Sequence, residues 1–113
     1  MEKVENHTAE FKQSWHDEYL KTVAAFANTE GGTIYIGYDD RGEVVGLEKS
    51  ETKKMLEDLP NKIRSKLGIT PFVREEIQNG KSLLNIEIPC SSFPVSCDGK
   101  FYIRAGSTTQ ELS

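Results

Sequence analysis

The stretch AFANTEGGTIYIGYDDRGEVVGL, residues 25–47, decides the fold of this chain. It joins the end of an apolar helix, a glycine pair, an alternating strand at 33–38 and the turn DDRG with no spare residues. Glycine ends helices because it adopts the left-handed conformation, and Asp and Gly are typical turn residues. The stretch therefore predicts a helix docked on a hairpin, whose second strand would be residues 43–47.

Two helices are predicted around this hairpin. Apolar residues recur at helical spacing over 15–28, after a short strand at 8–12, and Ser14 with Asp17 resembles a capping box. A second apolar stripe predicts a helix over 50–66, which Pro60 should kink or split.

The second half of the chain predicts two more hairpins and a helix start. The hairpins would join 72–77 to 83–88 around Asn79-Gly80, and 95–97 to 101–104 around Asp98-Gly99. Thr108 and Glu111 stand at capping-box spacing, so residues 107–111 predict the beginning of a helix. The fold class is therefore α+β, with two helices packed on a mostly antiparallel sheet built from hairpins.

Length and composition indicate one soluble domain. The chain has 113 residues, of which 36% are hydrophobic and 28% charged, and a helix starting at 107 would be too short to be stable alone. We therefore expect residues 1–113 to be the N-terminal domain of a longer protein. No apolar run approaches a membrane span, and without an export signal Cys90 and Cys97 should be reduced, so the expected location is cytoplasmic.

Charge is unevenly distributed along the chain. The net charge of −4 argues against binding of nucleic acid through overall electrostatic attraction alone. Residues 49–66, however, carry six basic and three acidic side chains, so this segment is +3 and the remainder is −7. An acidic protein could in this way still present a cationic surface.

Three blocks of the sequence resemble the Schlafen-AlbA domain family. They are EFKQS at 10–14, the central stretch at 25–47 and FYIRAGSTTQEL at 101–112. The resemblance covers nearly the whole chain, and the central block is its most specific part. It implies an α+β domain, usually at the N-terminus of a longer protein, that binds DNA in bacterial transcriptional regulators. Some animal members cut structured RNA with three acidic residues.

Transferred by motif, that acidic triad would be Glu5, Glu10 and Asp40, with Asp39 as an uncertain neighbour. Clustered carboxylates could hold Mg²⁺ or Mn²⁺, which would activate water; without this site no cofactor is expected. Glu5 and Glu10 are five apart, so they fall on opposite faces of a straight strand and converge only if the chain bends. The alternative is that both glutamates are surface charges and the aspartates serve the turn.

Basic residues suggest phosphate contacts at several places. Lys62, Arg64 and Lys66 lie in PNKIRSK, a stretch without an acid, and Lys12 follows the first strand. Arg104 precedes the predicted helix start at Ser107 and Thr108, where free backbone N–H groups would attract anions. The alternative is an ordinary solvated helix face and an arginine paired with an acid.

Three functions remain open from the sequence. The preferred one is a DNA-binding domain of a transcriptional regulator that binds through phosphates, with DNA more expected than RNA as the partner. The alternative is a metal-dependent endoribonuclease that uses the acidic triad. The third is a protein-interaction or dimerisation module with an exposed strand edge, which would form homodimers.

Overall fold

The computed structural model describes residues 5–112 of the chain. Its helices are a 3-10 turn η1 (Asp17–Tyr19), α1 (Leu20–Asn28) and α2 (Lys49–Leu67). Its strands are β1 (Ala9–Lys12), β2 (Gly32–Ile36), β3 (Phe72–Gln78), β4 (Lys81–Ile88), β5 (Ser96–Cys97), β6 (Lys100–Ala105) and β7 (Thr108–Glu111).

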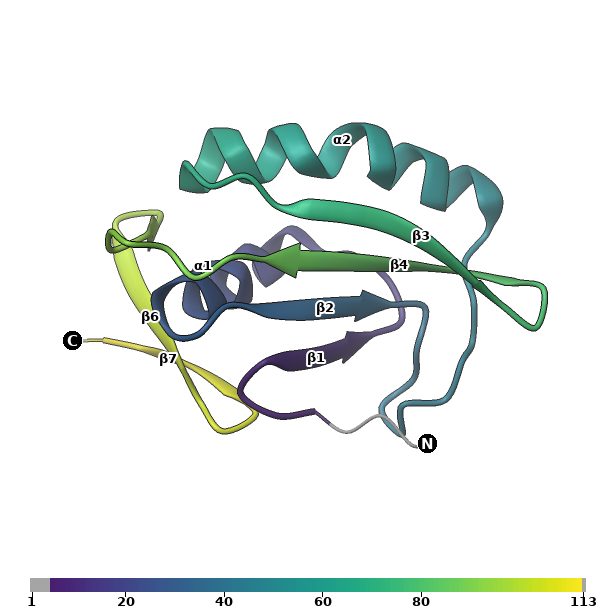
Figure 1. The fold of residues 1–113 in the computed structure, drawn as a ribbon, viewed down its shortest axis with the longest axis horizontal. Helices are drawn as coiled ribbons and strands as arrows, with labels where there is room; N and C mark the ends of the chain where they lie inside the picture. Colours follow the sequence, from purple (N-terminus) through teal and green to yellow (C-terminus); the bar gives the residue numbers. More distant parts are fainter. Residues whose placement is uncertain (1–4, 113) are drawn as a thin grey trace.

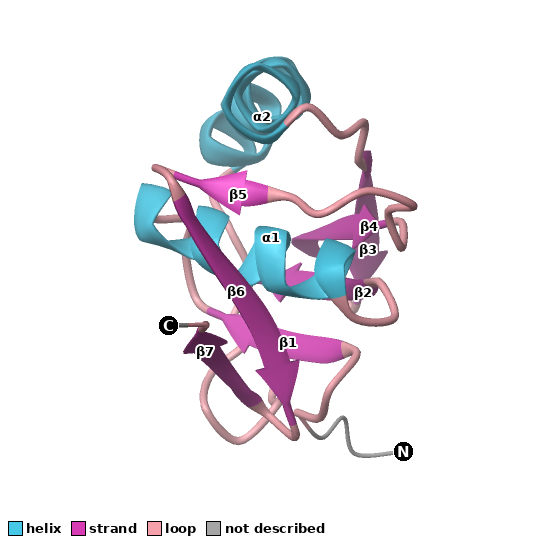
Figure 2. Ribbon diagram, turned by 90° about the vertical axis from the view of Figure 1, so that its left-hand side faces the viewer, coloured by secondary structure: helices cyan, strands magenta, loops and turns pink. Residues whose placement is uncertain are grey.

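The strands form two sheets with α1 between them. The larger sheet has the order β1-β2-β4-β3, in which β1 and β2 are parallel and the other neighbours antiparallel (Figure 1). The smaller sheet has the order β5-β6-β7. Figure 2 shows α1 enclosed between β6 on one side and the larger sheet on the other, while α2 packs against β3 and β4. The predicted α+β class with mostly antiparallel strands is confirmed.

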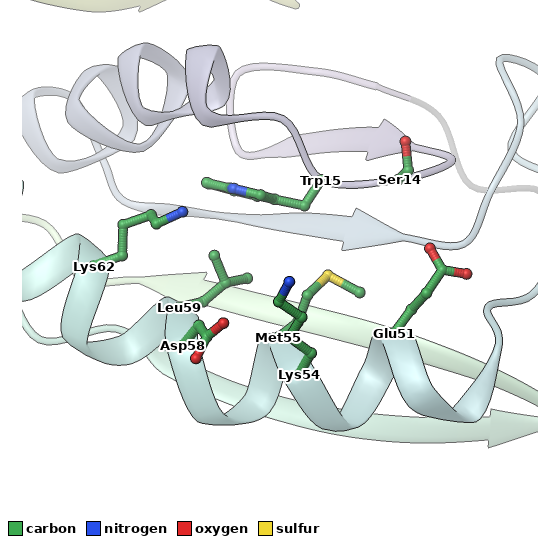
Figure 3. Close-up of a pocket in the computed structure, with 8 residues that line it drawn as sticks. All are labelled: Ser14, Trp15, Glu51, Lys54, Met55, Asp58, Leu59 and Lys62. Atoms are coloured by element: carbon green, nitrogen blue, oxygen red, sulfur yellow. The ribbon is translucent and has the colours of Figure 1, made fainter.

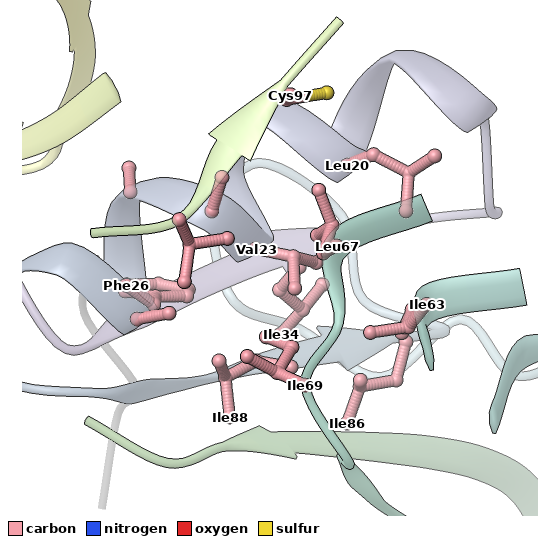
Figure 4. Packing of buried hydrophobic residues seen from close by; sticks show 14 of the residues in the cluster. Leu20, Val23, Phe26, Ile34, Ile63, Leu67, Ile69, Ile86, Ile88 and Cys97 are labelled. Atoms are coloured by element: carbon pink, nitrogen blue, oxygen red, sulfur yellow. The ribbon is translucent and has the colours of Figure 1, made fainter. Parts of the chain in front are cut away.

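Helix α1 is buried over most of its surface because nearly all of its residues are apolar or small, with Lys21 as its exposed position. Seven of its nine residues are buried, as is typical of a helix that is covered all round. Phe26 and Val23 of α1 pack with Ile34 of β2, Ile63 of α2 and Ile86 of β4 in one core (Figure 4).

The predicted hairpin inside residues 25–47 is wrong. Strand β2 pairs with β1 on one edge and β4 on the other, so no edge is left for residues 43–47. The chain does reverse at the predicted turn, where Val44 forms an isolated bridge with Tyr38 and the N–H of Val45 donates to the carbonyl oxygen of Gly37 at 2.8 Å. Residues 43–47 nevertheless form no strand, because long-range pairing with β1 and β4 occupies both edges of β2.

The predicted C-terminal helix start is also wrong. The chain reverses at Gly106, where φ is +60°, and Thr108–Glu111 returns as β7 beside β6. A few residues give a helix little stability of their own, whereas a strand here gains a complete set of pairs with β6.

The start of the first helix departs from the capping-box prediction. Residues 17–19 form the 3-10 turn before α1, and no side chain caps this turn. The Asp17 carboxylate instead accepts hydrogen bonds from Trp15 Nε1 and Lys62 Nζ, both at 2.8 Å.

The two remaining hairpins and α2 are confirmed. Asn79 and Asp98 have φ of +51° and +52° and each is followed by a left-handed glycine, as the tight turns of hairpins require. Helix α2 continues through Pro60 and ends at left-handed Gly68. No helix among the described residues is long and apolar enough to cross a membrane.

Candidate functional site

The basic side chains of α2 divide between two flanks of the helix. Successive residues turn by about 100°, so Arg64 lies on the opposite side of the axis from Lys62 and Lys66. Lys62 and Lys66 line a hollow together with Lys21 of α1. Lys53 lines another hollow beside Glu75 of β3. The stretch PNKIRSK therefore does not form one continuous cationic patch.

Lys62 is partly neutralised. Its Nζ lies 2.8 Å from Asp17 Oδ1, and the hydrogen bond from Lys62 lowers the pKa of Asp17 below its usual value. Arg64 and Lys66 are exposed, and neither forms an ion pair among residues 5–112. Of the three predicted contacts in this stretch, Arg64 and Lys66 thus remain available to a ligand.

Arg104 is a buried structural residue, and its predicted role as a surface phosphate contact is wrong. Its side chain has no exposed area, and Nη1 lies 3.0 Å from Glu10 Oε1. Nη2 donates to the carbonyl oxygen of Asn6 at 2.8 Å, and the guanidinium lies 4.8 Å from the centre of the Phe26 ring. The alternative, an arginine paired with an acid, is confirmed.

Ser107 and Thr108 do not form the predicted anion site. Because the segment is a turn and a strand, it has no row of free N–H groups at a helix start. The Thr108 hydroxyl donates to the carbonyl oxygen of Ala105 at 2.8 Å, within the turn.

Lys12 belongs to the acidic part of the molecule. Its Nζ lies 4.8 Å from the centre of the Tyr19 ring. Its charge contributes to the lowered pKa of Glu5 and opposes the rise in the pKa of Glu10. It therefore does not extend the basic surface of α2.

Glu5 and Glu10 converge because the chain bends between them. Asn6 and Ala9 form a bridge that reverses the chain, and the two carboxyl groups are hydrogen-bonded to each other. Burial, the hydrogen bond with Glu5 and the charge of Glu5 raise the pKa of Glu10 to about 7, against the opposing charge of Arg104.

The pKa of Glu5 moves in the other direction. Burial opposes its ionisation, but hydrogen bonds with Glu10 and the Phe11 N–H, together with Lys12 and Arg104, hold the pKa of Glu5 below its usual value. The pair therefore shares one proton, which Glu10 carries first as the pH falls.

Asp40 of the predicted triad and its neighbour Asp39 lie in the turn after β2 and do not join the glutamate pair. Asp39 Oδ1 accepts the backbone N–H groups of Arg41 and Glu43, both at 2.9 Å, so it shapes the turn. Asp40 is exposed in the same loop. Within residues 5–112 no three His, Cys, Asp or Glu side chains are grouped so that they could hold a metal ion. The structure thus joins Glu5 to Glu10 but does not add Asp40, and a catalytic role for these residues stays a prediction.

A cleft that the sequence did not single out lies between α2 and the connection from β1 to η1 (Figure 3). Its volume is about 340 Å³. The residues lining it are Ser14, Trp15, Glu51, Lys54, Met55, Asp58, Leu59 and Lys62. The six residues from α2 follow the spacing i, i+3, i+4, i+7, i+8, i+11, which marks one helix face. That spacing was visible in the sequence, but the facing Trp15 was not.

Comparison with known proteins identifies the domain type. A family model described as Schlafen, AlbA_2 matches residues 5–113. The structure of the DIP2311 protein from Corynebacterium diphtheriae aligns with a TM-score of 0.75 at 19% identity over 94% of this chain, which corresponds to only 22% of that protein's chain. The N-terminal domain of a RecG-related protein from Nitrosomonas europaea aligns with a TM-score of 0.65 at 28% identity, over 93% of this chain and 82% of that domain.

Proposed function

Because this chain belongs to the Schlafen AlbA_2 family, we propose that it is a nucleic-acid-binding domain that contacts phosphates through exposed basic side chains of α2. The observation that carries the proposal is the state of Arg64 and Lys66, which are exposed on opposite flanks of the last turn of α2 and form no ion pair among residues 5–112. They lie in a segment with a net charge of +3 inside an acidic protein.

DNA is the proposed target. The RecG-related relative carries the name of an ATP-dependent DNA helicase, and this domain would serve a similar polymer as the N-terminal module of a regulator. Phosphate contacts give affinity and position but read no base sequence directly. The isolated domain should therefore bind duplexes of different sequence with similar affinity.

Fluorescence anisotropy with a labelled duplex tests this proposal. We expect binding at low salt that weakens steeply as salt is added, because phosphate contacts release counterions. The double variant Arg64→Glu with Lys66→Glu should weaken binding about tenfold or more. Its thermal midpoint should fall only modestly, because both positions are exposed but lie in the last turn of α2, where acids oppose the helix dipole.

The matched control is Lys81→Glu with Lys100→Glu, which changes the net charge equally at exposed positions on β4 and β6. The control should bind much better than the α2 variant. Equal losses of duplex affinity in the two variants would show that binding depends only on the net charge of the protein. No binding at low salt would refute the proposal for this domain.

Metal-dependent cleavage of structured RNA is a second candidate, favoured by the contact between Glu5 and Glu10. A third carboxylate from Asp40 would have to join them, and Glu10 would have to share its oxygens with Arg104. Incubation of a hairpin RNA with Mn²⁺ or Mg²⁺ tests it. Cleavage that Asp40→Ala abolishes would support the nuclease, whereas cleavage that survives this change would come from a contaminant.

Self-association through a strand edge is a third candidate. Strand β3 lies at one edge of the larger sheet, and Phe72 and Ile77 on it are 61% and 58% exposed. Exposed edges of this kind can pair with another chain. Light scattering tests it, and a dimer that Ile77→Lys disrupts would support this reading.

A further inference from the structure

We propose that the cleft between α2 and the β1–η1 connection binds an unpaired nucleotide, whose base stacks on Trp15 and whose phosphate meets Lys54 or Lys62. This inference rests on the proposed function and specifies its ligand as a nucleobase with an exocyclic amino group and an attached phosphate. The nucleotide can be free or part of a single strand, since both present the same chemistry.

The two walls of the cleft suit a flat aromatic ligand. In Figure 3 the Trp15 ring lies on one side, and Met55 and Leu59 of α2 lie on the other. Bases stack on aromatic side chains in sites for single-stranded nucleic acid, because every base has a π face. The volume of about 340 Å³ is at the small end of the range for small-molecule sites, so one base fits better than a larger ligand.

The Trp15 wall is held in place before any ligand arrives. Its Nε1 donates to Asp17 Oδ1 at 2.8 Å, and its ring meets the Tyr19 ring edge-on at 5.7 Å between centres. Asp17 in turn holds Lys62. A wall that is already ordered loses less conformational entropy on binding, which favours affinity.

The charged groups of the cleft match the polar groups of a nucleotide. Lys54 and Lys62 bring ammonium groups to the cleft, as Figure 3 shows, and each ammonium has three donors for phosphate oxygens. Asp58 supplies a carboxylate on the same helix face, and Glu51 offers its second oxygen, since Oε1 already accepts the N–H of Glu48 at 3.3 Å in the capping box of α2. Carboxylates accept hydrogen bonds from the amino group of cytosine. Thymine and uracil have no amino group at that position, so they should bind less well.

The face of α2 that lines the cleft is long enough to contact more than one nucleotide of a strand. Glu51 and Lys62 are eleven residues apart on α2, which corresponds to about 16 Å along the helix at its usual rise. A single strand could therefore pass along the cleft with one base against Trp15, while its neighbouring phosphates approach the lysines.

Trp15 is the only tryptophan of the chain, so its fluorescence reports directly on this cleft. The experiment titrates the full chain with CMP, with cytidine, and with short oligo-dC and oligo-dT strands. We expect saturable quenching by CMP and oligo-dC, and at least severalfold weaker binding of cytidine and oligo-dT. Saturation by oligo-dC alone would identify a strand as the occupant, and saturation by CMP as well would extend the site to free nucleotides.

Two neighbouring lysines provide a matched pair of variants. Lys54 lines the cleft, whereas Lys53 is exposed on the opposite flank of α2 beside β3. Lys54→Glu should weaken oligo-dC binding about tenfold, and Lys53→Glu should weaken it much less. Trp15→Leu should weaken binding of a labelled oligo-dC by a similar factor, provided that circular dichroism shows an intact fold, because stacking on an aromatic ring contributes strongly to single-strand affinity.

Equal effects of Lys54→Glu and Lys53→Glu, or unchanged Trp15 emission when oligo-dC is bound, would overturn this inference. Its failure is separable from that of the proposed function. Salt-sensitive duplex binding with unchanged Trp15 fluorescence would support the proposed function and refute nucleotide binding in the cleft. Quenching by CMP without any binding of DNA would support nucleotide binding and refute the proposed function.

Discussion

Arg104 Nη1 lies 3.0 Å from Glu10 Oε1, and this buried ion pair joins β6 to β1 across 94 positions of the sequence. The same guanidinium donates to the carbonyl oxygen of Asn6 and to the hydroxyl of Thr109 on β7. One side chain of β6 therefore links β1 to the smaller sheet. It contacts β1 through Glu10, the segment before β1 through Asn6, and β7 through Thr109.

Removing this guanidinium should destabilise the protein strongly. Arg104→Gln leaves the Glu10 carboxylate and several acceptors without their donor in a buried place, and breaking such a pair typically costs about 3–5 kcal/mol. Lys100→Gln on the same strand breaks only the exposed pair with Glu111 and should cost less than about 1 kcal/mol. Urea unfolding of both variants measures the difference, and similar losses would contradict the structural role of Arg104.

The shared proton of Glu5 and Glu10 predicts a pH dependence. Folding raises the pKa of Glu10 from 4.5 to about 7, so the folded state binds more protons than the unfolded state between these values. The stability that Glu10 contributes is therefore fully present below about pH 4.5 and is lost as the pH rises through about 7. The lowered pKa of Glu5 acts below this window.

Glu10→Gln removes this titration. The free energy of unfolding of the wild type minus that of Glu10→Gln should fall between pH 5 and pH 8. Urea unfolding at four pH values across this range measures it. Titrating groups away from the pair cancel because both proteins contain them, and Glu5, whose pKa is coupled to that of Glu10, titrates below this range. A difference that stays constant, or that rises with pH, would show that the pair does not share a proton as described.

Releasing Lys62 should strengthen DNA binding. Asp17→Asn removes the charged partner of Lys62 while its side chain can still accept from Trp15, so a third cation on α2 becomes available to phosphate. Glu18→Gln makes the same charge change at the next residue, for which no ion pair with Lys62 exists. We expect a severalfold gain in duplex affinity by anisotropy for Asp17→Asn and a smaller gain for Glu18→Gln. Equal gains would mean that Lys62 is not held back by Asp17.

Gly31 should tolerate a side chain less well than Gly68. Their φ angles are alike, +77° and +72°, but a Cβ on Gly31 would lie 2.7 Å from the Ile88 carbonyl oxygen, while one on Gly68 would meet open space. Gly68→Ala should cost about 1 kcal/mol for its backbone conformation, and Gly31→Ala about 1–3 kcal/mol more because the neighbouring backbone must move. Thermal or urea unfolding compares the two, and equal costs would contradict the close contact between this glycine and the end of β4.

The sequence identified several of the candidate site residues, but it did not predict which of them contact one another. The resemblance pointed to Glu5 and Glu10 together, and they do meet. The spacing of five gave no reason for it, because the bend at Asn6–Ala9 depends on the bridge between these residues. For Arg104 the sequence left a phosphate contact and a pairing with an acid both open, and it could not identify Glu10 as that acid because Glu10 stands 94 residues away. Trp15 gave no signal at all, since its importance comes from the α2 face that lies across the cleft.

By itself, the sequence determined the features whose causes lie within a few residues. Asn79-Gly80 and Asp98-Gly99 turn their hairpins because left-handed residues fit that turn, and the apolar stripe of α2 with Gly68 at its end sets the length of the helix. Only the tertiary structure decided the partners of β2, the strand at Thr108–Glu111 and the burial of Arg104. These depend on which distant segments together satisfy their hydrogen bonds and bury their apolar side chains in one core. That is a property of the whole folded arrangement, which no local sequence pattern contains.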